Sequence, residues 1–353
     1  MRPFDEMSVD HVGFYVDDLA AQTTTLVDSF GFTVSGQADI SGEARSVGLG
    51  RSEIRLLLTE PVASDHPGSA YLENHGFGAA DIAFGVADAA DAYHEAVQQG
   101  ARPVSGPAAH DGVVTATVMG FGDVVHTFVE RSGDTDGQAF PWLSPVAEAT
   151  AGRDTGLSGV DHFAICVEAG QLDPMVEFYE RVFDFETIFT ERIVVGAQAM
   201  DSKVVQSASG AVTFTILEPD VSHVPGQIDQ FLKNHGGSGV QHVAFITDDI
   251  VRSVDSISAQ GVAFLSTPDS YYTMLGERLE PAGHSLEDLQ RLDILADEDQ
   301  DGQLFQIFAR STHPRKTFFF EVIERVGART FGGGNIKALY EAVEVQRSKD
   351  GDV

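Results

Sequence analysis

Two stretches of this sequence, Val9–Asp18 (VDHVGFYVDD) and Val160–Ala169 (VDHFAICVEA), share one pattern of polar and apolar residues. In each, apolar side chains alternate as they do along a β-strand with two different faces. Each is followed by a helix-like run, LAAQTTTLVDSFGF after the first and PMVEFYERVFDFE after the second. The two stretches therefore predict a strand and helix that occur twice in the chain.

The similarity continues downstream of both stretches. The segment from Gly78, GAADIAFGVADAADAYHEAVQQG, matches the segment from Gly239, GVQHVAFITDDIVRSVDSISAQG. Both predict a strand and then an amphipathic helix that ends at a glycine. HTFVER, which ends at Arg131, resembles FEVIER, which ends at Arg325. Because the order is kept throughout, we interpret the chain as a duplicated module.

The repeat predicts where the modules begin and end. We expect a first module over residues 1–131, a linker rich in Gly, Ser, Asp and Thr over 132–158, and a second module over 159–353. Strand–helix–strands units predict an α+β fold with helices against a curved, mostly antiparallel sheet. After the second module, Gly332–Gly334 predicts a flexible joint and Asn335 the N-cap of a terminal helix.

Composition limits the possible partners. The 353 residues include 22 Lys and Arg but 54 Asp and Glu, a net charge of −32. Such a surface repels phosphate backbones and anionic lipids, so we expect neither nucleic acid nor membrane as a partner. Cys166 is the only cysteine, which excludes an intrachain disulfide and a cysteine-built metal site. Without a basic-then-apolar start or a long apolar run, we expect a soluble, cytoplasmic protein.

Equivalent positions of the two modules differ in chemistry. His11 corresponds to His162, but Asp81 corresponds to His242 and Thr127 to Glu321. Two histidines and one carboxylate are the ligand set of a non-haem Fe(II) facial triad, which leaves three coordination positions open. The second module therefore offers a metal site that the first one lacks.

Strand alternation supports the same interpretation. His162 shares its face with Ala164 and Cys166, and His242 shares its face with Ala244, whereas bulky apolar residues occupy the opposite faces. Glu321 interrupts an apolar run, where an unpaired buried carboxylate would be costly. The alternative is that both histidines are hydrogen-bonded core residues and Glu321 meets an arginine. Of the other histidines, we expect His126 to be structural and most of the rest to be solvated, as is the acidic turn ADEDQDG at Ala296–Gly302.

These stretches carry a family resemblance. VDHFAICV, GVQHVAFITDD, GQLFQIF, FFFEVIER and FGGGNIKALYEAVE resemble the 4-hydroxyphenylpyruvate dioxygenase family of two-module vicinal oxygen chelate proteins, over nearly the whole chain. The resemblance implies a second module that forms an open barrel around Fe(II), with His162, His242 and Glu321 as ligands and a terminal lid helix. It also implies a first module that has lost its metal.

Within that family, one branch forms homogentisate and another forms 4-hydroxymandelate from the same substrate. Homogentisate-forming members carry Pro-x-Asn-Glu-Pro where this chain has Thr215, Ile216, Leu217, Glu218 and Pro219. The terminal helix reads N-I-K-A-L-Y from Asn335, where the family usually reads N-F-K-A-L-F. These departures, together with MLGER, resemble the 4-hydroxymandelate branch. The leucine side chain cannot form a hydrogen bond. We therefore hypothesise that Leu217 lets the aromatic ring of the substrate rotate, so that the benzylic carbon faces the iron.

The resemblance thus implies an Fe(II)-dependent dioxygenase that converts 4-hydroxyphenylpyruvate and O2 to 4-hydroxymandelate and CO2 by oxidative decarboxylation and benzylic hydroxylation. Two alternatives stay open, a homogentisate-forming dioxygenase and a metal-free binding protein of the same fold. We expect a homo-oligomer, a dimer, that serves secondary metabolism. The substrate pocket that the resemblance implies is lined by Ser202, Thr215, Leu217, Gln306, Phe331 and Tyr340.

Overall fold

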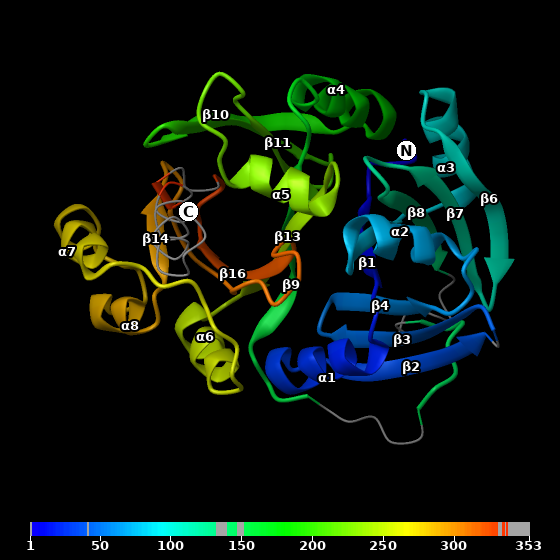
Figure 1. The fold of residues 1–353 in the computed structure, drawn as a ribbon, viewed down its shortest axis with the longest axis horizontal. Coiled ribbons are helices and arrows are strands. Elements are labelled where there is room, and N and C mark those ends of the chain that lie inside the picture. The colour runs from blue at the N-terminus through cyan, green and yellow to red at the C-terminus, as the bar shows by residue number, and fades with distance from the viewer. Residues whose placement is uncertain are drawn as a thin grey trace.

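The computed structural model describes residues 2–40, 42–131, 140–146, 152–330, 334–335 and 337. Within these ranges the chain forms two eight-stranded sheets, each curled around its own interior, with most of the helices outside the sheets (Figure 1). The first sheet uses residues 8–131 and the second uses residues 157–326. The duplicated α+β fold is therefore confirmed, while the module limits 1–131, 132–158 and 159–353 stay a prediction.

The strands of the first sheet lie in the order β2-β3-β4-β1-β5-β8-β7-β6. The elements of this half are β1 (Ser8–Tyr15), α1 (Leu19–Phe30), β2 (Thr33–Ile40), β3 (Ala44–Arg51), β4 (Ile54–Pro61), α2 (Pro67–His75), β5 (Gly78–Gly85), α3 (Ala89–Gln98), β6 (Pro103–His110), β7 (Val113–Met119) and β8 (Val125–Arg131). Two strand–helix–three-strand units, one from β1 and one from β5, meet at the antiparallel pair β1–β5.

The second sheet repeats this order as β10-β11-β12-β9-β13-β16-β15-β14. Its elements are β9 (Leu157–Cys166), α4 (Leu172–Phe183), β10 (Glu186–Val195), β11 (Gln198–Gln206), β12 (Thr213–Pro219), α5 (Gln227–His235), β13 (Gly239–Thr247), α6 (Ile250–Ser258), α7 (Asp269–Arg278), α8 (Leu286–Arg291), β14 (Leu295–Glu298), β15 (Gln303–Phe308) and β16 (Phe319–Val326). Helices α7 and α8 have no counterpart in the first half. None of the helices in the described ranges is long and apolar enough to span a membrane.

The same capping chemistry starts helices in both halves. The side chains of Asp18, Asp88 and Asp249 accept a hydrogen bond from a backbone N–H in the first turn of α1, α3 and α6. An aspartate that has just left a strand satisfies a helix donor that has no partner within the helix. These three helices therefore begin in the same way, whereas α4, the counterpart of α1, begins after Gln171 without a side-chain cap.

The two faces of the central strands separate the core from the site. Phe163, Ile165, Val243 and Phe245 belong to the main apolar core, as the alternation predicts. Ala164 and Ala244, on the opposite face, belong to two smaller clusters inside the second sheet. The small side chains leave room beside the histidines, and the large ones hold the sheet against its helices and the other module.

The main core continues across the boundary between the modules. His126, on β8, donates from Nδ1 to the Ile82 carbonyl, and Nε2 of the neutral ring accepts a hydrogen bond of 2.8 Å from the hydroxyl of Tyr179 on α4. At the equivalent position of the second module, Phe320 packs on Phe30 of the first, with ring centroids 5.1 Å apart. His126 is fully buried, so its predicted structural role agrees with its contacts.

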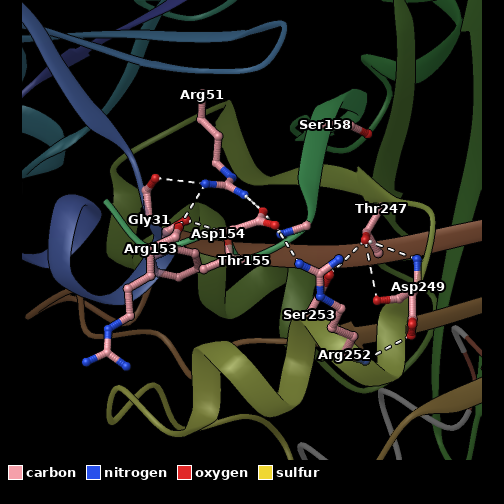
Figure 2. Close-up of polar contacts among 12 residues, drawn as sticks. Gly31, Arg51, Arg153, Asp154, Thr155, Ser158, Thr247, Asp249, Arg252 and Ser253 are labelled. Atoms are coloured by element: carbon pink, nitrogen blue, oxygen red, sulfur yellow. Dashed lines mark hydrogen bonds and ion pairs between the residues drawn. The ribbon is translucent and has the colours of Figure 1, made fainter. Parts of the chain in front are cut away.

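The described part of the linker is bound to both modules. Phe140 and Leu143 are buried, and Ser144 pairs with Gln37 of β2. Nearer the second module, the Asp154 carboxylate accepts hydrogen bonds from Arg51 of β3 at 2.6 Å and from Arg252 of α6 (Figure 2). The composition of residues 132–158 indicated a linker, but these contacts join residues about a hundred positions apart, so no local sequence pattern predicts them.

Candidate metal centre

Three neighbouring strands of the second sheet bring His162, His242 and Glu321 together. His162 lies on β9, His242 on β13 and Glu321 on β16, and all three side chains are buried. The Oε2 atom of Glu321 lies 3.4 Å from Nε2 of His162 and 3.0 Å from Nε2 of His242. One ligand atom from each residue lies within 4.8 Å of the other two, so the three can hold one metal ion.

Strand register produces this arrangement from residues that are far apart in sequence. Ala244 is paired with His162 on one side and with Glu321 on the other. Side chains of paired residues on neighbouring strands point to the same face. Ala244 is therefore the small residue between the two strands that carry His162 and Glu321, and His242 projects from its own strand two residues earlier.

Electrostatics links the three groups. Burial disfavours a charge on His162, but the carboxylates of Glu321 and Asp161 outweigh it and raise the pKa of His162 to about 9. Burial likewise opposes ionisation of Glu321, yet the neighbouring histidines hold the pKa of Glu321 below its ordinary value. Burial lowers the pKa of His242, although Glu321 partly offsets it. An anionic carboxylate thus faces two imidazoles in a buried site.

The donor set fits a divalent metal ion. The Oε1 atom of Glu321 is buried without a hydrogen-bond partner, and Nε2 of His242 makes no well-aligned hydrogen bond although Oε2 of Glu321 lies 3.0 Å away; buried polar atoms usually have a partner. Both atoms belong to residues of the cluster His162, His242 and Glu321. Two imidazoles and one carboxylate are the combination found at non-haem Fe(II) centres with open coordination positions. A cation there would satisfy both atoms and replace the proton on His162.

A second set of residues orients the histidines, and sequence reasoning missed it. Nδ1 of His162 lies 2.8 Å from Oδ1 of Asp161, and Asp161 accepts two hydrogen bonds from Arg325, at 2.7 and 2.8 Å. Such contacts fix the tautomer and the orientation of a metal-binding imidazole. Nδ1 of His242 has a weaker neighbour, the side-chain oxygen of Gln241 at 3.3 Å. The signal was present, since the repeats VDH and ER contain the aspartate and the arginine.

Four of the six predicted pocket residues are described, and they face the same interior as the three metal-binding candidates. Thr215 is paired with Ala164, Ser202 with Leu217, and Gln306 with Ile323, which shares its face with Glu321. These four side chains are buried. The predicted residues Phe331 and Tyr340, and most of the predicted Gly332–Gly334 joint and terminal helix, lie outside the described residues.

Thr215 has a special position because the second module is itself built from two similar units. It is paired with Ala164, two residues after His162, just as Glu321 is paired with Ala244, two residues after His242. Thr215 therefore occupies, in the first unit, the place that Glu321 occupies in the second. Its Oγ1 is buried without a hydrogen-bond partner, so it is available to a molecule bound beside the metal-binding candidates.

Asn335 does not have the N-cap role that the sequence predicted. Asn335, predicted as an N-cap, has helical backbone itself. Its Oδ1 lies 3.1 Å from the hydroxyl of Tyr271 on α7. The side chain is thus used in a tertiary contact and is fully buried.

Three histidines expected to be solvated are buried between the modules. His75 and His235 end the helices α2 and α5, and their rings stack with centroids 4.2 Å apart. Burial and the neighbouring His75 lower the pKa of His235 to about 4. His313 is buried against Phe77. The expectation was wrong because it treated each histidine alone, whereas the repeated sequence Asn-His-Gly indicated that both helix ends lie at equivalent places.

Comparisons with known proteins match both modules of the chain. A family model described as hydroxyphenylpyruvate dioxygenase, HPPD, N-terminal matches residues 2–140, and one described as Glyoxalase/Bleomycin resistance protein/Dioxygenase superfamily matches residues 159–307. The 4-hydroxyphenylpyruvate dioxygenase of Dictyostelium discoideum is 33% identical, over 98% of this chain and 99% of that protein. That of Aspergillus fumigatus is 31% identical, over 98% and 93%.

A solved structure is similar over the same length. A mutant of 4-hydroxymandelate synthase from Streptomyces coelicolor is 42% identical, with a TM-score of 0.86 over 98% of this chain and 100% of that one. The same proteins therefore match both halves of this chain, and the similarity covers both modules. The chain belongs to the 4-hydroxyphenylpyruvate dioxygenase family of two-module vicinal oxygen chelate proteins.

Proposed function

We propose that this chain is an Fe(II)-dependent dioxygenase that converts 4-hydroxyphenylpyruvate and O2 to 4-hydroxymandelate and CO2. His162, His242 and Glu321 would hold the iron, because they converge in a buried site with unsatisfied donor atoms. When bound, Fe(II) would supply open coordination positions for the 2-oxo acid and O2 and would pass electrons from the substrate, which is oxidised, to O2, which is reduced.

The chain's own residues bind and orient the substrate. We assign Ser202, Thr215 and Gln306 as polar contacts because they are buried on the interior face of the second sheet. The substrate is an anion and the chain carries a net charge of −32, so the local positive charge that attracts it comes from the metal centre. Phe331 and Tyr340 remain proposed pocket residues from the family resemblance.

Leu217 is the single observation that carries the choice of product. It is buried in an apolar cluster with Ala164, Cys166 and Phe231, so this wall offers the substrate ring no hydrogen bond. An asparagine here would hold the ring by its amide, as the pattern of homogentisate-forming relatives suggests. An apolar wall lets the ring turn and presents the benzylic carbon, and displacements of about 1 Å in a reacting geometry change rates about a hundredfold.

Product analysis tests this proposal. The protein is incubated with 4-hydroxyphenylpyruvate, Fe(II) and O2, and the aromatic product is identified by chromatography and mass spectrometry. We expect 4-hydroxymandelate; homogentisate as the main product refutes the proposed reaction.

Replacing Leu217 with asparagine tests the role of the wall. We expect Leu217→Asn to shift the product toward ring hydroxylation, or to uncouple O2 consumption from product formation, because the amide gains a hold on the ring. Leu217→Met is the matched control, since it keeps the wall apolar at similar volume. An unchanged product ratio and unchanged coupling in Leu217→Asn contradict the positioning argument.

A further inference from the structure

Arg325, the arginine near the end of β16, contacts two parts of the second module at once. Its Nε and Nη2 donate to the carboxylate of Asp161, which in turn lies against Nδ1 of His162. Its Nη1 donates to the carbonyl oxygens of Thr330, at 2.8 Å, and Ala328, at 3.4 Å. One guanidinium therefore lies between a metal-binding candidate and the segment that follows β16.

That segment, residues 327–330, is held from its other side by Asp299. One carboxylate oxygen of Asp299 accepts hydrogen bonds from the N–H groups of Arg329 and Thr330, each at 2.8 Å, and from the Thr330 hydroxyl at 2.9 Å. The other oxygen accepts from the N–H groups of Asp301 and Gly302. The acidic stretch was expected to be a solvated turn, but residues 296–298 lie in β14 and Asp297 is buried. Asp299 is partly exposed, and its carboxylate anchors residues 327–330.

We propose that Arg325 is a positioning residue that couples metal binding at His162 to the seating of residues 327–330. This proposal rests on the metal site of the proposed function and not on the product. A metal ion on Nε2 of His162 fixes the ring, and the ring fixes Asp161 through Nδ1. Asp161 in turn fixes the guanidinium that holds the carbonyl of Thr330.

The shape of the guanidinium is what makes this linkage specific. Arginine presents five N–H donors in a rigid plane, so its position on the carboxylate sets the direction of the remaining donors. A lysine supplies one charged point and cannot hold the carboxylate by two bonds and the two carbonyls together. Coupling between two sites is reciprocal, so a seated segment also strengthens metal binding.

The first experiment measures amide hydrogen exchange of Arg329 and Thr330 with and without Co(II) alone, in the whole chain and without substrate. We expect Co(II) to slow the exchange of both amides in the wild-type protein. In Arg325→Gln we expect Co(II) affinity to fall roughly 10–100-fold, as for other residues that orient metal ligands, and the slowing to vanish even at saturating Co(II). Exchange that Co(II) does not change in the wild-type protein overturns the proposal, as does an Arg325→Gln protein that retains the slowing.

The chain offers a matched control and a second variant. Arg131 makes the same pair of bonds to Asp10 in the first module, so Arg131→Gln should leave Co(II) affinity and the exchange of Arg329 and Thr330 unchanged. Asp299→Asn weakens the anchor of the segment without touching the candidate ligands, and reciprocity predicts a severalfold lower Co(II) affinity. Unchanged affinity in Asp299→Asn contradicts the coupling even where Arg325→Gln fails to fold.

The outcomes separate this inference from the proposed function. A wild-type protein that binds no Co(II) refutes the metal site itself. A protein that binds Co(II) but forms homogentisate refutes the proposed product and leaves the coupling standing. Binding of Co(II) without any effect on Arg329 and Thr330 refutes the coupling alone.

Discussion

Both modules contain an arginine, an aspartate and a histidine in the same arrangement, but they differ at the other two positions of the candidate metal site. In the first, Arg131 holds Asp10 at 2.6 Å and Asp10 lies 2.7 Å from Nδ1 of His11. The second repeats this with Arg325, Asp161 and His162. Among the described residues, the group that could hold a metal ion lies in the second module. The arginine–aspartate–histidine arrangement is therefore common to both modules, whereas the candidate metal-binding group, among the described residues, belongs to the second.

The difference lies in the other two positions and in the space beside them. The carboxylate of Asp81 accepts hydrogen bonds from the Thr127 hydroxyl at 2.6 Å and from the Thr127 N–H at 3.1 Å. Its partners are thus supplied by the protein, whereas Oε1 of Glu321 has none. Phe140 and Trp142 also pack on His11, with ring centroids 5.3 and 6.1 Å away. In the first module the linker fills the place where the second has its candidate site.

The largest expected effect comes from the position that distinguishes the modules most. In Glu321→Ala we expect metal affinity to fall by more than the roughly 10–100-fold that residues around the ligands typically account for, and product formation to fall with it. Calorimetric titration with Co(II) and a product assay measure both. The matched variant of the first module, Thr127→Ala, should keep the metal affinity and instead lose about 1–3 kcal/mol of folding free energy, because Asp81 loses a buried partner.

Either of two results would remove the distinction between the modules. Wild-type Co(II) affinity in Glu321→Ala would show that Glu321 is not a ligand. A loss of Co(II) affinity in Thr127→Ala, with the protein still folded, would show that the first module takes part in metal binding.

The repeats in the sequence predicted which residues of the two modules occupy equivalent positions. The equivalences of His11 with His162, Asp81 with His242 and Thr127 with Glu321 agree with strand pairs in the two sheets. The sequence did not predict side-chain contacts between strands that are not adjacent in the sheet. An example is the contact of Arg325 with Asp161, which are 164 residues apart. A strand pattern shows which face a side chain occupies, but not which side chain of another strand it meets.

The modules also differ in the buried contact that each makes with the other. His126 and Phe320 occupy equivalent positions, yet His126 uses a hydrogen bond to Tyr179 where Phe320 uses ring packing. We expect His126→Phe to lower the free energy of unfolding by about 1–3 kcal/mol, because the Tyr179 hydroxyl is left buried without a partner. Tyr179→Phe should have a similar cost. The double variant should cost less than the sum of the two single variants, since the Tyr179 hydroxyl and its partner are both gone and only the Ile82 carbonyl, 3.0 Å from Nδ1 of His126, still loses a contact. Urea denaturation measures all three proteins; costs that add in the double variant contradict a shared hydrogen bond.

Lowering the pH should reduce the difference in the free energy of unfolding between the wild-type protein and His126→Phe. Burial lowers the pKa of His126 from 6.5 to about 4. Between these values the unfolded chain takes up a proton that the folded chain excludes, so this histidine destabilises the fold increasingly as the pH falls. Phenylalanine has no such proton uptake. The difference in stability between the two proteins should therefore shrink from pH 7 to pH 4, and a constant difference would contradict the assignment of a neutral, buried His126.

The smallest effect is expected where the linker joins the modules at the surface. Asp154 bridges Arg51 of the first module and Arg252 of the second (Figure 2), but 68% of its side chain is exposed. Exposed ion pairs typically contribute about 0–1 kcal/mol and are screened by salt. Asp154→Ala should therefore lower the melting temperature less than His126→Phe does, and the difference from wild type should disappear in high salt. A larger or salt-independent loss would mean that the modules are held together mainly by this bridge and not by the buried contacts of His126 and Phe320.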